Sequence, residues 1–404
     1  MNRGLKNGGP LAETLGGSYD RILGSYDAGT PGPTVLVLCG LHGNERAGVA
    51  AARRVLETLR RESLPLRGRV VAICGNLGAL ESGRRYLGRD LNRAWTPAEV
   101  RLLQERGPLP GDPEGREQLD LLAEFERQEA ECDDELVLVD LHSSSAPGAP
   151  FTFIGDTLQS RRVALRMPVP VILGIEEWID GSLLEFFQDR GHVAVAVEGG
   201  QHDDPRTIDC HEAAIWMVLH AMGVLVRPDR ALLAAHYTLL KETARGNPGV
   251  VEVVYRQTLS PDDGFAMEPG FENFDSVEEG QLLARDAAGE IRAPRPGRML
   301  LPLYQGQGDD GFFLGHEVRR SWLRVSAVLR RLGCDRLVPY LPGVSRDPLD
   351  PEQLIVNRRV ARFFVVELLH LCGYRRVSAQ ADRLAFVRRT ERRPGRRPGR
   401  RRKG

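Results

Sequence analysis

Short apolar runs alternate with amphipathic stretches through the first half of the chain. Four of these runs predict buried strands: Thr34–Cys39, Arg69–Cys74, Glu135–Leu141 and Val193–Val197. Helical spacing of apolar residues predicts helices at Glu45–Arg60, Arg116–Glu131, Gly181–Arg190 and Asp209–Met222. Continuous apolar strands that alternate with helices are typical of an α/β domain with a mixed, largely parallel sheet flanked by helices. We expect this domain within residues 1–228.

The pattern changes in the second half. From Gly249 to Leu314 the chain is rich in Gly, Pro and short strand signals, which predicts a small all-β domain over residues 245–314. Beyond Gly315 the spacing becomes helical, most clearly in Pro351–Cys372, and this predicts a C-terminal helical extension over residues 315–389. Residues 390–404 are rich in Arg, Pro and Gly and predict a disordered basic tail.

The formal net charge of zero hides an asymmetry. Segment 392–404 holds eight basic residues and no acidic one, so the rest of the chain carries 0 − 8 = −8. The tail is a candidate for weak contact with nucleic acid or another polyanion, although a solvated tail without a specific partner is the favoured interpretation. An oligomer is left open.

Composition narrows the class of protein. Hydrophobic residues make up 42% and charged residues 27%, as in ordinary soluble domains. No apolar run approaches the roughly 20 residues of a spanning helix, and the N-terminus has no apolar core like that of a signal peptide. The six cysteines are scattered without a CxxC pair, which favours reduced thiols and a cytoplasmic location.

Residues of the metal-ligand type follow two of the predicted strands. His42 and Glu45 stand three positions apart after the first strand, and Asp140 and His142 end a later one. Imidazole and carboxylate both bind zinc, and three protein ligands leave one position open for water. Asp140 is placed to orient a ligand. Taken singly, a strand-end His and a Glu at a helix N-terminus have ordinary structural explanations, but two strand ends together favour a metal site.

Charged residues elsewhere complete a candidate catalytic set. The stretch RYLGRDLNR (85–93) offers one Arg to polarise a carbonyl and another to bind a carboxylate, unless it is merely an exposed basic loop. Glu198 ends the strand VAVAVE and is suited to act as general base, with Glu176 and Glu177 as competitors.

These motifs, taken in order as HGNE, RYLGRDLNR, DLH and VEGG, resemble those of the succinylglutamate desuccinylase/aspartoacylase family, over about residues 30–315. That family is similar to the zinc carboxypeptidases, and its C-terminal domain is a barrel-sandwich hybrid. The resemblance implies a zinc-dependent deacylase that cleaves the amide of a small carboxylate-bearing substrate. It implies one Zn²⁺ per chain, bound by His42, Glu45 and His142. Arg85 would contact the scissile carbonyl, Asn92 and Arg93 would hold a carboxylate, and Glu198 would be base and then proton donor.

The chain also departs from that family. Arg190 and Tyr304 do not align cleanly with an Arg and a Tyr that the family uses, Asp309 and Asp310 lie close to Tyr304, and an extension like 315–404 is absent from the family. A zinc carboxypeptidase or peptide amidase is therefore an alternative function. A non-catalytic module that binds a partner through its basic tail is another.

Overall fold

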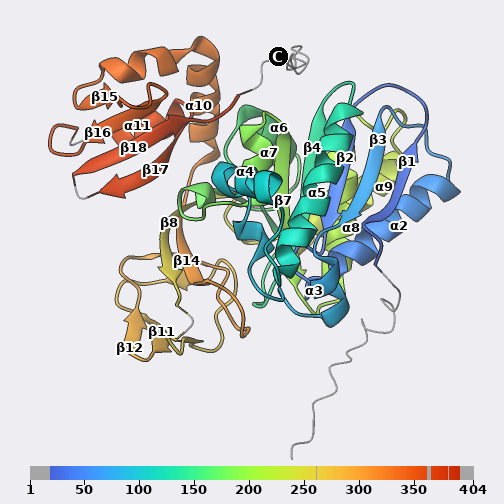
Figure 1. Ribbon diagram of the computed structural model, residues 1–404, viewed down its shortest axis with the longest axis horizontal. Helices are drawn as coiled ribbons and strands as arrows, with labels where there is room; N and C mark the ends of the chain where they lie inside the picture. Colours follow the sequence, from blue (N-terminus) through green and yellow to red (C-terminus); the bar gives the residue numbers. More distant parts are fainter. Residues whose placement is uncertain (1–18, 261, 362–364, 381, 392–404) are drawn as a thin grey trace, which may run out of the picture.

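The computed structural model describes residues 19–260, 262–361, 365–380 and 382–391. A large sheet runs through most of the molecule (Figure 1). In the order in which they pair, its strands are β1 (Ile22–Asp27), β3 (Arg69–Cys74), β2 (Thr34–Cys39), β4 (Leu136–Ser144), β7 (Val193–Gln201), β5 (Phe151–Phe153), β6 (Val171–Leu173), β8 (Val250–Thr258), β14 (Asp310–Glu317), β13 (Gly297–Leu300) and β10 (Ser276–Val277).

The centre of this sheet is parallel. Strand β2 pairs in parallel with both β3 and β4, and β4 pairs in parallel with β7. Every residue of β2 and β4 is buried, because helices cover both faces of the sheet. This double burial explains the continuous apolar runs in the sequence. The carboxyl ends of β2, β4 and β7 lie at one edge of the sheet, where side chains from all three strands and their following loops meet.

Helices flank the sheet on both sides. Their bounds are α2 (Ala47–Arg61), α3 (Leu77–Ser82), η1 (Leu91–Arg93), α4 (Pro97–Arg106), α5 (Pro113–Ala130), α6 (Leu158–Ala164), η2 (Ile175–Glu177), α7 (Leu183–Asp189), α8 (Arg206–Ala221) and α9 (Arg230–Thr243). Helix α8 packs against α2 and α9. Helices α5 and α7 lie in front of the sheet in Figure 1 and pack through Phe125 and Phe187, whose ring centroids are 5.0 Å apart. The expected mixed α/β architecture is confirmed.

Residues 245–314 contain only strands among the described residues, as the sequence predicts. Strands β8, β14, β13 and β10 extend the large sheet, while β9 (Ala266–Met267), β11 (Leu282–Asp286) and β12 (Gly289–Arg292) form a separate antiparallel sheet. A satellite core that includes Met299 and Phe312 lies between them. The boundary between the predicted domains 1–228 and 245–314 stays a prediction, because one sheet contains strands from both ranges.

The C-terminal extension is not simply helical, and here the expectation is wrong. It contains α10 (Arg320–Leu332), η3 (Cys334–Tyr340) and α11 (Val365–Leu371), but also an antiparallel sheet of β15 (Val344–Arg346), β16 (Gln353–Asn357), β18 (Arg383–Arg388) and β17 (Tyr374–Gln380). The run predicted as one helix, Pro351–Cys372, begins with β16. Leu354 and Val356 of β16 are buried on one face and pair across from β18. The extension lies beside α6 and α7 in Figure 1.

Two smaller expectations concern the cysteines and the helices. All six cysteines are free, and four of them, Cys39, Cys74, Cys210 and Cys372, are buried. Among the described residues, no helix combines the length and apolarity needed to cross a membrane. Of the predicted disordered basic tail, 390–404, residues 392–404 lie outside the described residues, whereas Glu391 is described and accepts hydrogen bonds from the N–H of Leu158 and from Arg330.

Candidate active site

The loop after β2 brings the first two predicted ligands together. Gly40 turns the chain with a φ of +67°, a conformation that favours glycine. A Cβ on Gly43 would lie 2.0 Å from the backbone of Ala79, so only glycine fits there. The loop then leads into α2, with both His42 and Glu45 buried. The local sequence therefore fixes a tight turn that directs both side chains inward.

His42, Glu45 and His142 converge as the sequence predicts. The Nδ1 atom of His42 lies 2.8 Å from Glu45 Oε1, and Nδ1 of His142 lies 3.0 Å from Glu45 Oε2. The candidate ligand atoms of all three side chains lie within 4.8 Å of one another. Two imidazole nitrogens and one carboxylate form the donor set that zinc favours in catalytic sites. The residues present therefore fit a single zinc ion.

Two buried carboxylates lie against the Nε2 atoms of the two histidines, on the side away from Glu45. Asp90 Oδ1 lies 3.0 Å from His42 Nε2, and Asp140 Oδ2 lies 2.9 Å from His142 Nε2. A carboxylate on the far nitrogen orients an imidazole and leaves its Nδ1 atom free to bind a metal. Asp140, singled out in the sequence, has this position, whereas Asp90 was not assigned a role there.

The electrostatics of this cluster follow from its burial. Burial would raise the pKa of Glu45, but His42 and His142 hold it well below its usual range. Burial would lower the pKa of His142, but Asp140 and Glu45 raise it well above its usual range. The Glu45 carboxylate thus remains charged and available to a cation.

The RYLGRDLNR stretch is an ordered loop pinned by one buried side chain. Glu114 of α5 is fully buried and accepts hydrogen bonds from the backbone N–H groups of Leu87, Gly88 and Arg89, at 2.6, 2.9 and 3.3 Å. This anchor orders the loop, and the side chains of Arg85 and Arg93 are only 15% and 23% exposed, which argues against a merely exposed basic loop. It also fixes the start of the loop, where Arg85 donates to Asp90 Oδ2 at 3.1 Å and to Glu45 Oε1 at 3.4 Å.

Asn92 and Arg93, at the other end of this loop, form hydrogen bonds with residues outside the loop. The amide oxygen of Asn92 accepts a hydrogen bond from the N–H of Leu183 at 2.9 Å. Arg93 donates through Nη2 to Asp310 at 2.8 Å, and Arg256 binds the other oxygen of Asp310. The Nε atom of Arg93 is buried and has no hydrogen-bond partner among the described residues. Arg93 can thus offer one donor to a ligand.

Glu198 lies directly beside His142. The two residues pair across β4 and β7 in parallel register, which places both side chains on the same face of the sheet. Oε2 of Glu198 is buried and unpartnered among the described residues. Burial, reinforced by the charge of Glu45, raises the pKa of Glu198 to about 7. A carboxylate with such a pKa can both accept and return a proton near neutral pH.

All seven predicted site residues line one cavity of about 140 Å³. Its other walls come from β5, η2, α7 and the loop around residues 301–310. Of the two competitors for Glu198, Glu176 lines the cavity but is ion-paired with Arg389, and Glu177 lies 3.0 Å from His370. Their partners leave Glu198 as the carboxylate beside the ligand cluster.

Arg190 and Tyr304 do not join the cavity. Arg190 is ion-paired with Glu129 at 3.2 Å, and the hydroxyl of Tyr304 donates to the carbonyl of Glu268 at 2.8 Å. Asp309 and Asp310 do line the cavity.

Sequence reasoning missed two histidines that support the site. His202 Nδ1 lies 2.8 Å from Ser143 Oγ, and its Nε2 lies 3.2 Å from Gln305 Oε1. His211 donates through Nε2 to the carbonyl of His142 at 2.7 Å, and burial lowers the pKa of His211 to about 4, so it is neutral. No local motif marks either residue, because their partners are far away in the sequence.

Comparison with known proteins identifies the segment that carries these motifs. The model of the succinylglutamate desuccinylase/aspartoacylase catalytic domain matches residues 31–160. The resemblance inferred from the motifs is therefore confirmed for this segment. A succinylglutamate desuccinylase of Burkholderia pseudomallei is 38% identical over 80 residues, which are 20% of this chain and 23% of that protein. The desuccinylase of Yersinia pestis is 37% identical over 60 residues, 15% of this chain and 18% of that protein. The chain thus spans about a quarter or less of the length of these relatives.

Solved structures share the fold of most of this chain. An ectoine utilization protein from Ruegeria pomeroyi, solved with product bound, has a TM-score of 0.52 at 20% identity and covers 71% of this chain and 86% of its own. A succinylglutamate desuccinylase/aspartoacylase from Rhodobacter sphaeroides has a TM-score of 0.51 at 19% identity and covers 72% and 87%. The carboxypeptidase-like fold expected from the motifs is therefore confirmed for most of the chain.

Proposed function

We propose that this protein is a zinc-dependent hydrolase that cleaves the amide bond of an N-acyl amino acid or a related small carboxylate. The observation that carries the proposal is the convergence of His42, Glu45 and His142 beside Glu198 in one cavity. A purely binding role would not require a free carboxylate next to a metal-ligand triad. The matched family supports a deacylase.

His42 Nδ1, Glu45 and His142 Nδ1 would hold the metal, with Asp90 and Asp140 fixing the two rings. Zinc bound there would supply Lewis acidity that polarises a carbonyl oxygen and activates water. This role requires an open coordination position, which three protein ligands leave.

Glu198 would accept the proton of the attacking water and deliver it to the leaving amine. Its unpartnered oxygen and its pKa of about 7 suit both transfers. Arg85 would donate to the scissile carbonyl oxygen as negative charge develops on it, because its guanidinium is held toward the ligand cluster by Asp90. Arg93, through Nε, and Asn92 would orient a substrate carboxylate.

The size of the cavity favours a small substrate over a peptide. The loop around residues 301–310, contributed by the strand-rich segment, forms one wall through Leu301, Leu303 and Gln305. A peptidase needs an open groove, whereas this cavity of about 140 Å³ is walled on several sides. The deacylase is therefore preferred to a carboxypeptidase or peptide amidase.

Three further expectations remain proposals. The buried free thiols support a cytoplasmic protein. Weak contact of the basic tail with a polyanion and assembly into an oligomer stay predictions from the sequence.

The test is amine release from a panel of N-acyl amino acids and short peptides, with the zinc-loaded protein, Glu198→Gln and a surface control, Glu290→Gln. We expect release from small N-acyl amino acids by the wild type and the control, while Glu198→Gln keeps its zinc and loses most turnover. Release from peptides alone would move the assignment to a peptidase. An active Glu198→Gln variant would refute the role of Glu198.

A further inference from the structure

Five of the apolar side chains that line the cavity, together called the apolar wall below, are Phe153, Ile175, Ile179, Leu184 and Phe313. The carboxylate of Glu176, the neighbour of Ile175 in the chain, lines the same cavity. Glu176 is only 5% exposed. A charged side chain is rarely buried among apolar neighbours without a partner or a function.

The two oxygens of Glu176 have different surroundings. Oε1 accepts hydrogen bonds from both Nε and Nη2 of Arg389, at 3.2 and 2.6 Å. Oε2 is buried and has no hydrogen-bond partner among the described residues. Leaving a buried charged acceptor unpaired is unfavourable, so a ligand that supplies a donor at Oε2 would be bound selectively.

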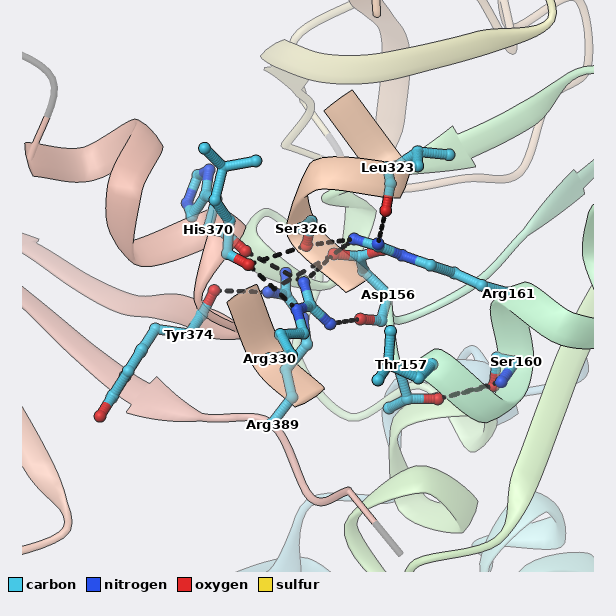
Figure 2. Close-up of polar contacts among 12 residues, drawn as sticks. Asp156, Thr157, Ser160, Arg161, Leu323, Ser326, Arg330, His370, Tyr374 and Arg389 are labelled. Atoms are coloured by element: carbon cyan, nitrogen blue, oxygen red, sulfur yellow. Dashed lines mark hydrogen bonds and ion pairs between the residues drawn. The ribbon is translucent and has the colours of Figure 1, made fainter. Parts of the chain in front are cut away.

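Arg389 belongs to the C-terminal extension and is itself held firmly. Its Nη1 donates to the carbonyl of Tyr374, and Asp156 Oδ2 lies 3.9 Å away. Figure 2 shows Arg389 next to Arg330, both directed toward Asp156 at the junction of the extension with the α/β segment. Two hydrogen bonds from one guanidinium to Oε1 fix the position of that oxygen, so the end of the Glu176 side chain is restrained before any ligand arrives.

We propose that Glu176 determines substrate specificity by accepting a hydrogen bond from a cationic nitrogen at the end of an aliphatic side chain. The substrate class is then an N-acyl derivative of a basic amino acid, with an ammonium or guanidinium group. Arg389 acts as the positioning residue. This inference rests on the proposed deacylase function and deepens it.

The apolar wall and the surrounding charges select this class. Methylene groups pack against Phe153, Ile179 and Leu184, while a carboxylate in that position would face Glu176 and be repelled. Arg389 is shared with Glu177, 3.6 Å away, as well as with Asp156, so it does not serve Glu176 alone. A charge-assisted hydrogen bond is roughly twice as strong as a neutral one, which favours a cation over a hydroxyl or amide.

The test compares side chains of matched size on the zinc-loaded protein. Nα-acetyl and Nα-succinyl derivatives of lysine, ornithine and arginine are compared with those of norleucine, which lacks the cation, and of glutamate. We expect kcat/KM to favour the cationic substrates over norleucine by about 10- to 100-fold, the range of one hydrogen bond to a charged group. In Glu176→Gln this ratio should fall to within a few-fold of one, while Glu290→Gln retains it.

Arg389→Met tests positioning separately. It should reduce the same ratio mainly through KM, and Arg389→Lys should restore part of it. If Glu176→Gln does not fold, calorimetric binding of free lysine against free norleucine to the wild type replaces it, with tighter binding of lysine expected.

The outcomes separate the two proposals. Hydrolysis without preference for cationic side chains, or a preference that survives Glu176→Gln, overturns the inference and leaves the deacylase intact. Equal binding of lysine and norleucine also overturns it. No hydrolysis of any derivative by zinc-loaded protein overturns the proposed function and the inference with it.

Discussion

Replacing Asp156 by Asn should lower the free energy of unfolding, because Asp156 holds the C-terminal extension against the α/β segment through ion pairs. Asp156 is buried and receives two guanidinium groups: Arg161 Nη2 lies 2.7 Å and Arg330 Nη2 2.6 Å from its Oδ2. Figure 2 shows Arg161 and Arg330 approaching it from the two segments. The pKa of Asp156 is lowered far below its usual range, because these arginines outweigh the effect of burial. Asn has nearly the same shape and tolerates the φ of +48° found here, so the substitution isolates the charge.

The magnitude follows from what each arginine would retain. Removing one partner of a buried ion pair typically costs about 3–5 kcal/mol, because a buried charge is left without compensation. Arg330 would keep Glu391, 3.1 Å away, and the carbonyl of His370. Arg161 would keep the carbonyl of Leu323. With these remaining partners we expect the lower end, about 3 kcal/mol.

Equilibrium unfolding in urea measures this loss, with proteolysis of the extension as a second readout. The slope of unfolding in urea rises with protein size above the about 1–3 kcal/mol/M of small proteins, so the midpoint should fall by somewhat less than about 1 M. The control Asp209→Asn removes a half-exposed pair with Arg54 and should change stability by less than about 1 kcal/mol. Adding Arg161→Met to Asp156→Asn should recover part of the loss, because Asp156 is the carboxylate that pairs with Arg161 among the described residues, so the charge of Arg161 is otherwise left uncompensated. An unchanged midpoint for Asp156→Asn would refute the reasoning.

Three further predictions concern pH, the loop and the metal. Burial would lower the pKa of His370, but Glu177 and Glu252 raise it to about 9. The stabilisation that protonated His370 provides, up to about 3 kcal/mol, should thus be complete below pH ~6.5 and lost as the pH rises through 9. In urea unfolding, the wild type should be more stable than His370→Gln at pH 6, and the two should have similar stability at pH 10. Glu114→Gln should weaken the anchor of the loop that carries Arg85 and lower kcat/KM by about 10- to 100-fold with zinc content unchanged; a drop in bound zinc would point to the ligands instead. Dialysis against a chelator should abolish activity and lower Tm, and zinc should restore both; full activity in metal-free protein would exclude a zinc enzyme.

Local patterns in the sequence were sufficient for the α/β core. Strands β2 and β3 begin and end as predicted, because a short run of apolar residues buried on both faces suits a strand inside a sheet that helices cover on both sides. The ligand cluster was predictable for a related reason. His42 and Glu45 share one turn, and His142 lies near the end of a strand, so the local sequence determines where each ligand lies.

Tertiary structure alone decided the rest. The start of Pro351–Cys372 has apolar spacing that suits a helix, yet β16 forms there because β15 and β18 pair with it on both sides. Arg93 meets Asp310 and Glu176 meets Arg389 across separations of more than 200 residues. Periodicity reports which face of an element is buried, but it does not report which distant side chain will lie against that face. The ligand cluster could therefore be predicted from the sequence. The partners of Arg93 and Glu176 in the cavity could be identified only in the folded chain.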